Sequence, residues 1–255
     1  MKEIDFEKKK VILENDIISY CYLVLADGFV GISSKYQKKP KDKQIGFEVR
    51  LTNSQKLNQK ADLNFGITRK GYAWVFTQEN YTTIGFTDLY DKNIKYLELL
   101  KEFASKKGYS IDTKNIKGAF IPRRVEKLNY HNALLIGDAA GLVDSLTQEG
   151  IYYALVSAKE AVYAIKENNL TLYKKNMKTV VKELNASRII ANIFYNPFIS
   201  KRLWKPKKKK TNNSFRIYLF KKVLTGNDFS YQKIHSYLKE YKKSRKENDN
   251  EYRIY

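Results

Sequence analysis

The segment Asn132–Ala154, NALLIGDAAGLVDSLTQEGIYYA, carries the strongest fold signal in this sequence. It opens with a short apolar run, Ala133–Ile136, which is typical of a buried strand and which ends at Gly137 and Asp138. A helical pattern follows over about residues 150–167. Its predicted apolar face consists of Ile151, Ala154, Leu155, Ala158, Val162 and Ile165. A buried strand, a turn and a helix in this order predict an α/β layer.

A second run of the buried type lies earlier in the chain. Ile17–Ala26 is rich in β-branched and aromatic residues and ends at Asp27 and Gly28. Ligands of open α/β sheets lie beyond the carboxyl ends of strands, where glycine lets a ligand approach the backbone and a short carboxylate accepts hydrogen bonds from hydroxyl groups. The pairs Asp27-Gly28 and Gly137-Asp138 are therefore candidate ligand contacts, although such pairs taken alone are commonly just turns.

The middle of the chain predicts an antiparallel sheet with one helix. Apolar and polar residues alternate in Ile45–Leu51, Phe65–Phe76 and Tyr81–Phe86, as expected for strands with one solvated face. A helical stripe then follows, for which Asp91 is the expected cap and Gly108 the expected stop.

Composition excludes several classes of protein. The chain has 255 residues, which is enough for one large domain or two small ones. Its single cysteine rules out a disulfide framework. Its two histidines are too few to suggest a metal cluster. No apolar run reaches the roughly 18 residues that a membrane-spanning helix needs. The first residues, MKEIDFEKKK, lack the apolar core of a signal peptide, so we expect a cytoplasmic protein.

The net charge of +21 is unevenly distributed, since residues 201–255 hold 17 Lys and Arg against 5 Asp and Glu. Such a tail, with Lys207–Lys210 as an exposed loop, would be attracted to RNA or to an anionic membrane surface. The alternative is a coding bias that places lysine on every surface. Because the aromatic residues are not clustered with the basic ones, we expect no specific nucleic-acid partner.

Four segments carry a family resemblance. Asn132–Ala154 closely resembles the flavin-ribityl motif of FAD-dependent oxidoreductases of the para-hydroxybenzoate hydroxylase fold, and more narrowly that of the geranylgeranyl reductase family. Tyr22–Ser34, YLVLADGFVGISS, resembles the Asp-Gly motif of the same group. Gly71–Phe76 (GYAWVF), with Gly85, resembles its lipid-pocket signature, Tyr-x-Trp-x-Phe-Pro followed by Gly-x-Gly, and Val223–Tyr231 (VLTGNDFSY) resembles its C-terminal segment.

The resemblance implies an FAD site at the two strand ends and at the start of the helix that follows. Its implied cofactor-binding residues are Asp27, Gly28, Gly137, Asp138, Ala139, Gly150 and Ile151. Asp138 would accept hydrogen bonds from the ribityl chain, and Asp27 would lie near the ribityl and pyrophosphate groups. The helix start at Gly150 would face the pyrimidine edge of the flavin, where partial positive charge stabilises the reduced form. The sequence identifies no catalytic acid or base, because no Ser/His/Asp or Cys/His arrangement is evident, and no metal site is expected.

The resemblance also implies a substrate, an isoprenoid lipid whose C=C bonds are reduced. Tyr72, Trp74 and Phe76 alternate along a strand and so share one face, which in this family lines an apolar pocket for the isoprenoid chain. The alternative is that these aromatic side chains only fill a core. Two other functions stay open: a non-catalytic remnant that binds a lipid or a protein partner, and, with less support, a basic nucleic-acid binder.

The sequence departs from the family pattern in several places. It contains no Gly-x-Gly-x-x-Gly fingerprint for the pyrophosphate, and Asp27 lies only 26 residues after Met1. We therefore expect a C-terminal portion of such an enzyme, either truncated or completed by a separate N-terminal chain. The smaller departures indicate relaxed constraint or a shifted role, and they are Leu25, Gly31, Ser34, Thr77, Thr87, Ser145 and Gln148.

These observations predict an α/β fold with α+β character. Residues 1–36 and 118–175 would form a partial FAD/NAD(P)-binding three-layer unit, and residues 37–117 an antiparallel substrate-side sheet with one helix. Residues 176–255 would form a basic, mostly helical region that can lie at the periphery of a membrane.

Overall fold

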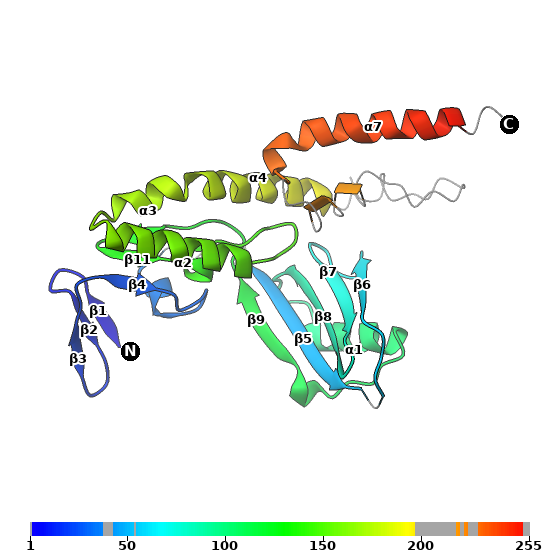
Figure 1. The fold of residues 1–255 in the computed structure, drawn as a ribbon. Helices are drawn as coiled ribbons and strands as arrows, with labels where there is room; N and C mark the ends of the chain where they lie inside the picture. The colour runs from blue at the N-terminus through cyan, green and yellow to red at the C-terminus, as the bar shows by residue number, and fades with distance from the viewer. Residues whose placement is uncertain are drawn as a thin grey trace.

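The structure is a computed structural model that describes residues 2–37, 43–53, 55–196, 218–219, 222–223 and 229–251. In Figure 1 a layer of helices over a few short strands lies beside a larger antiparallel sheet, as expected for an α/β fold with α+β character. The Lys207–Lys210 loop predicted from the sequence lies outside the described residues.

The helical layer is built on a small mixed sheet with the strand order β10-β11-β4. Its strands are β4 (Leu23–Leu25), β10 (Asn129–Tyr130) and β11 (Ala133–Leu135). The helices above it are α2 (Ile151–Lys166), α3 (Thr171–Asn176) and α4 (Lys178–Phe194). Strands β11 and β4 are parallel, and the buried β11 residues share one core with Tyr173, Met177 and Leu184 of the α3–α4 segment. The strand and helix predicted in 132–167 are therefore confirmed.

The prediction of one strand over Ile17–Ala26 is wrong. Its first part, β3 (Ile17–Ser19), pairs with β2 (Lys10–Ile12), which pairs with β1 (Glu3–Asp5) in a separate three-stranded antiparallel sheet. Only β4 enters the parallel pair. The physical reason is a bend at residues 21–22, which separates β3 from β4, so that β3 stays in the hairpin with β2 and leaves Ile17 and Ile18 exposed.

The second unit is a five-stranded antiparallel sheet with the order β6-β7-β8-β5-β9. The strands are β5 (Gln44–Thr52), β6 (Lys60–Phe65), β7 (Tyr72–Thr77), β8 (Tyr81–Leu89) and β9 (Lys117–Ile121). The predicted run Phe65–Phe76 is split by a turn between β6 and β7. Strand β9 belongs to this sheet, although the sequence placed the residues from 118 onward on the cofactor side, because its register with β5 (Phe47 opposite Gly118) extends the ladder.

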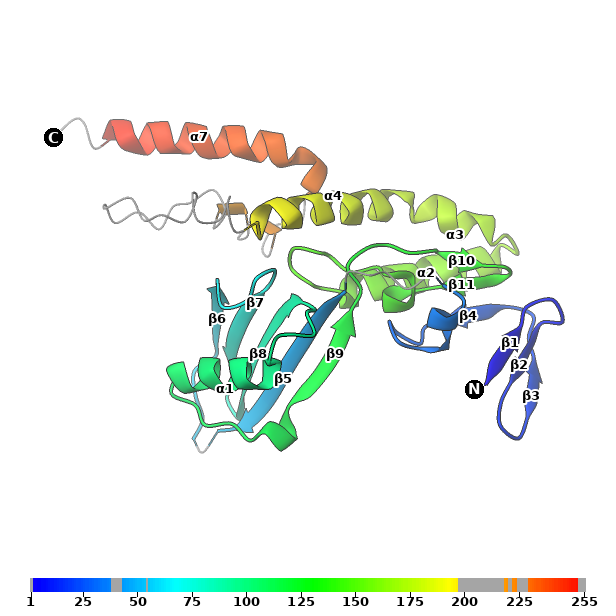
Figure 2. The ribbon, with the colours of Figure 1, turned by 180° about the vertical axis from the view of Figure 1, so that it is seen from behind.

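Helix α1 (Tyr96–Lys106) covers one face of this sheet, as Figure 2 shows. Leu100 and Phe103 of α1 pack on Val49, Ile84 and Phe86, which alternate along the strands and form a second core. On the other face, Phe65 and Tyr72 pack against the C-terminal end of α4, where Phe194 lies with its ring centroid 5.8 Å from that of Phe65.

The two predicted ends of helix α1 differ in outcome. The cap at Asp91 is wrong, because the helix begins after Lys95. The Asp91 carboxylate instead accepts the Asn93 N–H and pairs with Arg69 at 3.0 Å. The stop at Gly108 is confirmed, since this glycine follows the last helical turn with φ +84°.

The apolar face predicted for α2 is wrong for its bulky residues, while the predicted Ala154, Ala158 and Ile165 are partly buried. Ile151, Leu155 and Val162 are 80%, 68% and 52% exposed, whereas Ser157 and Ala161 are buried. Small side chains let the helix lie close to the β11 turn, so the bulky ones point outward.

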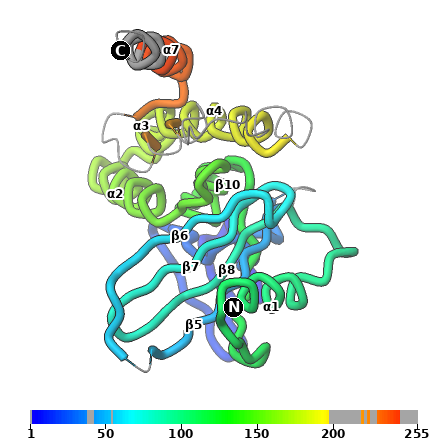
Figure 3. The backbone as a smooth tube through the Cα atoms, turned by 90° about the vertical axis from the view of Figure 1, so that its right-hand side faces the viewer, coloured from blue at the N-terminus to red at the C-terminus, as the bar shows by residue number. Residues whose placement is uncertain are grey.

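The C-terminal segment docks on α4. It consists of the short helix η4 (Tyr231–Lys233) and helix α7 (Ile234–Glu251), and Figure 3 shows α7 lying beyond the other helices when the molecule is seen end-on. The Glu183 carboxylate holds this junction by accepting hydrogen bonds from the Ser230 hydroxyl, the Tyr231 N–H and the Gln232 amide. Among the described residues, no helix combines the length and the apolar character needed to cross a membrane.

Candidate functional site

The structure brings the two predicted strand ends together. Leu25 of β4 lies opposite Leu135 of β11, and the Ile136 N–H donates to the Leu25 carbonyl at 3.1 Å. Because the strands are parallel, Asp27 and Gly137 leave the sheet at the same edge. The pairs Asp27-Gly28 and Gly137-Asp138 therefore line one edge.

Asp27 closes a tight loop. Its Oδ2 accepts the Ser33 N–H at 2.7 Å, while its Oδ1 is buried and has no hydrogen-bond partner among the described residues. A Cβ added to Gly31 would lie 2.2 Å from Asp27 Oδ2 and 2.3 Å from its carbonyl oxygen. Gly31 is therefore the residue that this loop requires, and Oδ1 is a buried acceptor that the described residues leave unpaired.

Asp138 sits at the start of the short 3₁₀-helix η3 (Gly137–Ala140). Within the described structure its half-buried carboxylate has neither a hydrogen-bond nor an ion-pair partner, and burial raises the pKa of this group. A Cβ on Gly150, which immediately precedes α2, would lie 3.0 Å from Asp138 Oδ1. The carboxylate thus faces the N-terminal end of α2.

Three other predicted cofactor residues, Gly137, Ala139 and Ile151, lie in η3 or at the start of α2. Gly137 has φ +55°, and its N–H donates to the Ser157 hydroxyl at 3.0 Å, which fixes the turn beneath α2. Ala139 is buried, and its carbonyl accepts the Gln37 amide at 2.8 Å. Ile151 is the first residue of α2 and lies largely in solvent.

The raised pKa of Asp138 predicts a pH-dependent stability. A carboxyl with a folded-state pKa above its unfolded value contributes stability that is complete below the unfolded pKa and is lost as pH rises through the folded pKa. Asp138→Asn should therefore unfold at higher denaturant concentration than the native protein near pH 7, and the difference should shrink as the pH falls toward 4. Urea titrations across this range measure it, and a difference that is independent of pH would contradict the assignment.

Hydrogen bonds from several elements hold the loop over residues 144–149, which lies after η3. The buried Asp144 carboxylate accepts the N–H groups of Leu146 and Thr147 at 2.8 and 3.0 Å. Burial raises the pKa of Asp144, and the Thr147 and Leu146 bonds act against that rise. The Tyr72 hydroxyl of β7 donates to the Thr147 carbonyl at 2.6 Å, and the Tyr195 hydroxyl donates to the Leu146 carbonyl at 2.7 Å. One loop therefore joins the strand-end site to the five-stranded sheet.

Ser145 explains one departure from the family pattern. Its N–H donates to the Ser187 hydroxyl of α4 at 3.1 Å, and its own hydroxyl donates to the Arg123 carbonyl at 2.8 Å. Proline, the residue usual in the family pattern, has no N–H and no hydroxyl, so it would leave both acceptors without this donor. Ser145 therefore ties the loop to α4 and to the end of β9.

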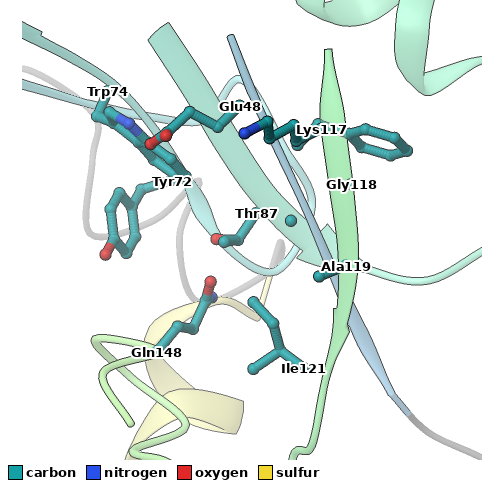
Figure 4. Close-up of a pocket in the computed structure, with 11 residues that line it drawn as sticks. Glu48, Tyr72, Trp74, Thr87, Lys117, Gly118, Ala119, Ile121 and Gln148 are labelled. Atoms are coloured by element: carbon teal, nitrogen blue, oxygen red, sulfur yellow. The ribbon is translucent and has the colours of Figure 1, made fainter. Parts of the chain in front are cut away.

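A pocket of about 320 Å³ lies on the sheet face opposite α1, against this loop. Figure 4 shows it between the strands and Gln148. Its lining residues are Gly46, Phe47, Glu48, Tyr72, Trp74, Thr87, Lys117, Gly118, Ala119, Ile121 and Gln148. The predicted residues Tyr72 and Trp74 thus line a pocket, while Phe76 lies outside the lining and stacks on Trp74 with ring centroids 6.0 Å apart.

Strand register accounts for the position of the Trp74 ring. Trp74 lies opposite Gly85 of β8, where an added Cβ would be 2.4 Å from the indole Cζ2. Sequence reasoning missed Glu48 and Lys117, which lie opposite each other on β5 and β9. Glu48 could have been found from the alternation of Ile45–Leu51, since it faces away from the apolar positions.

The chain is similar to known reductases, although no known protein-family profile matches it. It is 30% identical to the digeranylgeranylglycerophospholipid reductase of Methanocaldococcus jannaschii, over 61% of this chain and 44% of that protein. A reductase of the same name from Methanococcus aeolicus is 31% identical, over 48% and 34%. An uncharacterised Methanosarcina barkeri protein is 29% identical, over 68% and 48%. The chain thus spans about half the length, or less, of these relatives.

Solved structures share the fold. A geranylgeranyl bacteriochlorophyll reductase-like protein from Thermoplasma acidophilum superposes with a TM-score of 0.51 at 19% identity, covering 74% of this chain and 63% of that one. A flavin-dependent halogenase from a Brevundimonas species gives 0.53 at 10% identity, over 76% and 42%. At these identities the likeness shows the fold, which occurs in flavin-dependent enzymes.

Proposed function

Because this chain is a relative of the geranylgeranyl reductases, we propose that it forms the substrate pocket and the ribityl side of a flavin site in an oxidoreductase that reduces C=C bonds of an isoprenoid lipid. The observation that carries the proposal is the loop over residues 144–149. This loop follows the Asp138 turn directly, and its far end forms a wall of the Trp74 pocket. A cofactor held at the Asp138 turn and a substrate held in the Trp74 pocket would therefore lie close together, on either side of this loop.

The strand-end residues fit the sugar-alcohol stem of a flavin. Asp138 and the buried Asp27 Oδ1 are carboxylate acceptors without partners among the described residues, which suits the hydroxyl groups of a ribityl chain. Gly137 and Gly150 carry no side chain where the ligand and α2 approach Asp138. When bound, the flavin supplies the redox chemistry.

The protein's own residues would then bind and orient the cofactor and the substrate. Asp138 would hold the ribityl chain, and the free N–H groups at the start of α2 would place partial positive charge beside the ring. Tyr72 and Trp74 would hold the isoprenoid chain and exclude water from the C=C bond. The ADP half of FAD would be held by residues outside this sequence, since it lacks a Gly-x-Gly-x-x-Gly fingerprint.

Two partners belong to the proposal. The polypeptide that holds the ADP half would cover the outward face of α2, where Ile151 and Leu155 are exposed. The basic region after residue 200 would bring the protein to an anionic membrane surface that contains the lipid.

Asp138→Ala tests the flavin site. We expect flavin affinity to fall by roughly 1.5–3 kcal/mol, or about 10- to 150-fold, because a hydrogen-bond acceptor that carries charge is lost. Quenching of riboflavin, FMN and FAD fluorescence measures the affinity. Asp112→Ala is the control, since Asp112 accepts the Lys114 N–H in a loop on the sheet side.

Unchanged flavin affinity in Asp138→Ala would remove this residue from the site. Protein that stays colourless, both alone and together with a dinucleotide-binding half supplied from a relative, would overturn the proposed function.

A further inference from the structure

The Trp74 pocket contains polar atoms that the described residues leave unpaired. They are Trp74 Nε1, Thr87 Oγ1 and both amide atoms of Gln148, each buried and without a hydrogen-bond partner. All three residues line the same pocket, and in Figure 4 the Gln148 side chain reaches from the loop toward Thr87 on the sheet. Buried polar groups in native proteins are paired, so such a set at one cavity indicates a polar group of a ligand.

Gln148 has an unfavourable backbone conformation. Its φ is +63°, in the left-handed region that favours glycine. Its N–H donates to the Asp144 carbonyl at 2.8 Å, which holds the residue in this turn. A glutamine kept in a glycine conformation, with its amide buried and unpaired, has a function that resides in its side chain.

The types of polar atom define the ligand. The indole N–H only donates, whereas the Thr87 hydroxyl and the Gln148 amide both donate and accept. A ligand hydroxyl matches these types, because its oxygen can accept the indole N–H while its own O–H donates to the Gln148 carbonyl oxygen. Glu48 and Lys117 line the pocket with opposite charges, so the pocket has no net charge to attract a phosphate. The rest of the wall includes the apolar side chains of Ala119 and Ile121.

We propose that Trp74, Thr87 and Gln148 form a recess that binds an uncharged hydroxyl group at the polar end of an isoprenoid chain. This inference rests on the proposed function, since it names the polar part of the proposed substrate. Gln148 is then a specificity-determining residue, and Thr87 has the same role from the sheet side.

The test uses three C10 probes: geraniol, geranyl phosphate, and the hydrocarbon in which hydrogen replaces the geraniol hydroxyl. A chain of this length suits a pocket at the lower end of the usual range for small-molecule sites. Quenching of tryptophan fluorescence in the full chain measures each affinity. Geraniol should bind about tenfold more tightly than the hydrocarbon, and at least as tightly as the phosphate.

Variants separate recognition from folding. Gln148→Gly should lower geraniol affinity about tenfold, leave hydrocarbon affinity unchanged and raise the melting temperature, because the strained backbone is relieved. Thr87→Val should also weaken geraniol binding. Thr83→Val is its matched control, since Thr83 is buried on the same face of β8 and lies outside the pocket lining.

Each result bears on the inference. Equal binding of geraniol and the hydrocarbon would overturn the recess and leave the lipid pocket standing. Tighter binding of geranyl phosphate would overturn the neutral ligand. Failure of all three probes to bind would overturn the recess together with the lipid pocket, while flavin binding tests the cofactor site independently.

Discussion

Gly141→Ala is expected to destabilise the native state by about 2–5 kcal/mol, a large part of the stability of an ordinary domain. Two effects combine at this position. Gly141 has φ +70°, which is unfavourable for alanine, and its added Cβ would lie 2.1 Å from the Arg124 carbonyl oxygen. A backbone oxygen cannot rotate away as a side chain can, so the η3 turn would have to move. Chemical denaturation followed by circular dichroism measures the loss.

Gly66→Ala is the matched control for this substitution. Gly66 has φ +85° in the turn between β6 and β7, and nothing lies within 4 Å of its added Cβ. Gly66→Ala should therefore lose only about 1–2 kcal/mol of stability, which is the cost of placing alanine in the left-handed backbone conformation. Equal losses in the two variants would show that the approach of Arg124 to Gly141 is not tight.

The second large effect is expected at Gly31, where the family pattern has serine. Gly31→Ser should destabilise this chain by about 3 kcal/mol. The reason is the Asp27 loop, whose side-chain and backbone oxygens both lie within 2.3 Å of the added Cβ. The same variant should lose flavin binding, because Asp27 must move.

A double-mutant cycle with Asp27→Ala identifies the cause. Removing the Asp27 side chain relieves the contact with Oδ2 but leaves the contact with the carbonyl oxygen. The double variant should therefore be more stable than the sum of the two single losses predicts. Strict additivity of the two losses would show that the clash with the Asp27 carboxylate does not contribute to the destabilisation of Gly31→Ser.

The strand-end site could be predicted from sequence because its signal is local. A short apolar run that ends in Gly137-Asp138, or in Asp27-Gly28, gives both the strand and the ligand-facing turn, and two parallel strands place such ends at one edge. The extent of β3 could not be predicted in the same way. Because Ile17 and Ile18 are apolar, they are expected to be buried. In the structure they belong to the hairpin of β3 with β2, where both side chains are exposed to solvent.

The prediction of which side chains of α2 face the core was wrong for a different reason. Hydrophobic periodicity assigns bulky side chains to the core, yet the contact between α2 and the β11 turn is made through Ser157 and Ala154. Close packing of small residues carries almost no signal in a hydropathy pattern. The pocket needed tertiary information as well, since Gln148 meets Trp74 and Lys117 only after the loop and β9 are in place.

The departures from the family pattern gain physical explanations in the structure. Ser145 makes two hydrogen bonds, Gly31 makes room for Asp27, and Thr87 and Gln148 meet in one pocket.

The outward row of bulky side chains on α2 affects how the molecules behave toward one another in solution. Ile151, Tyr152, Leu155, Val162 and Tyr163 are 47–80% exposed on a chain whose net charge is +21. At low ionic strength, mutual repulsion keeps such molecules apart. Salt shortens the range of that repulsion to about 10 Å at 0.1 M but leaves the attraction between apolar rows intact. Colloidal stability therefore depends on the electrolyte as much as on the fold.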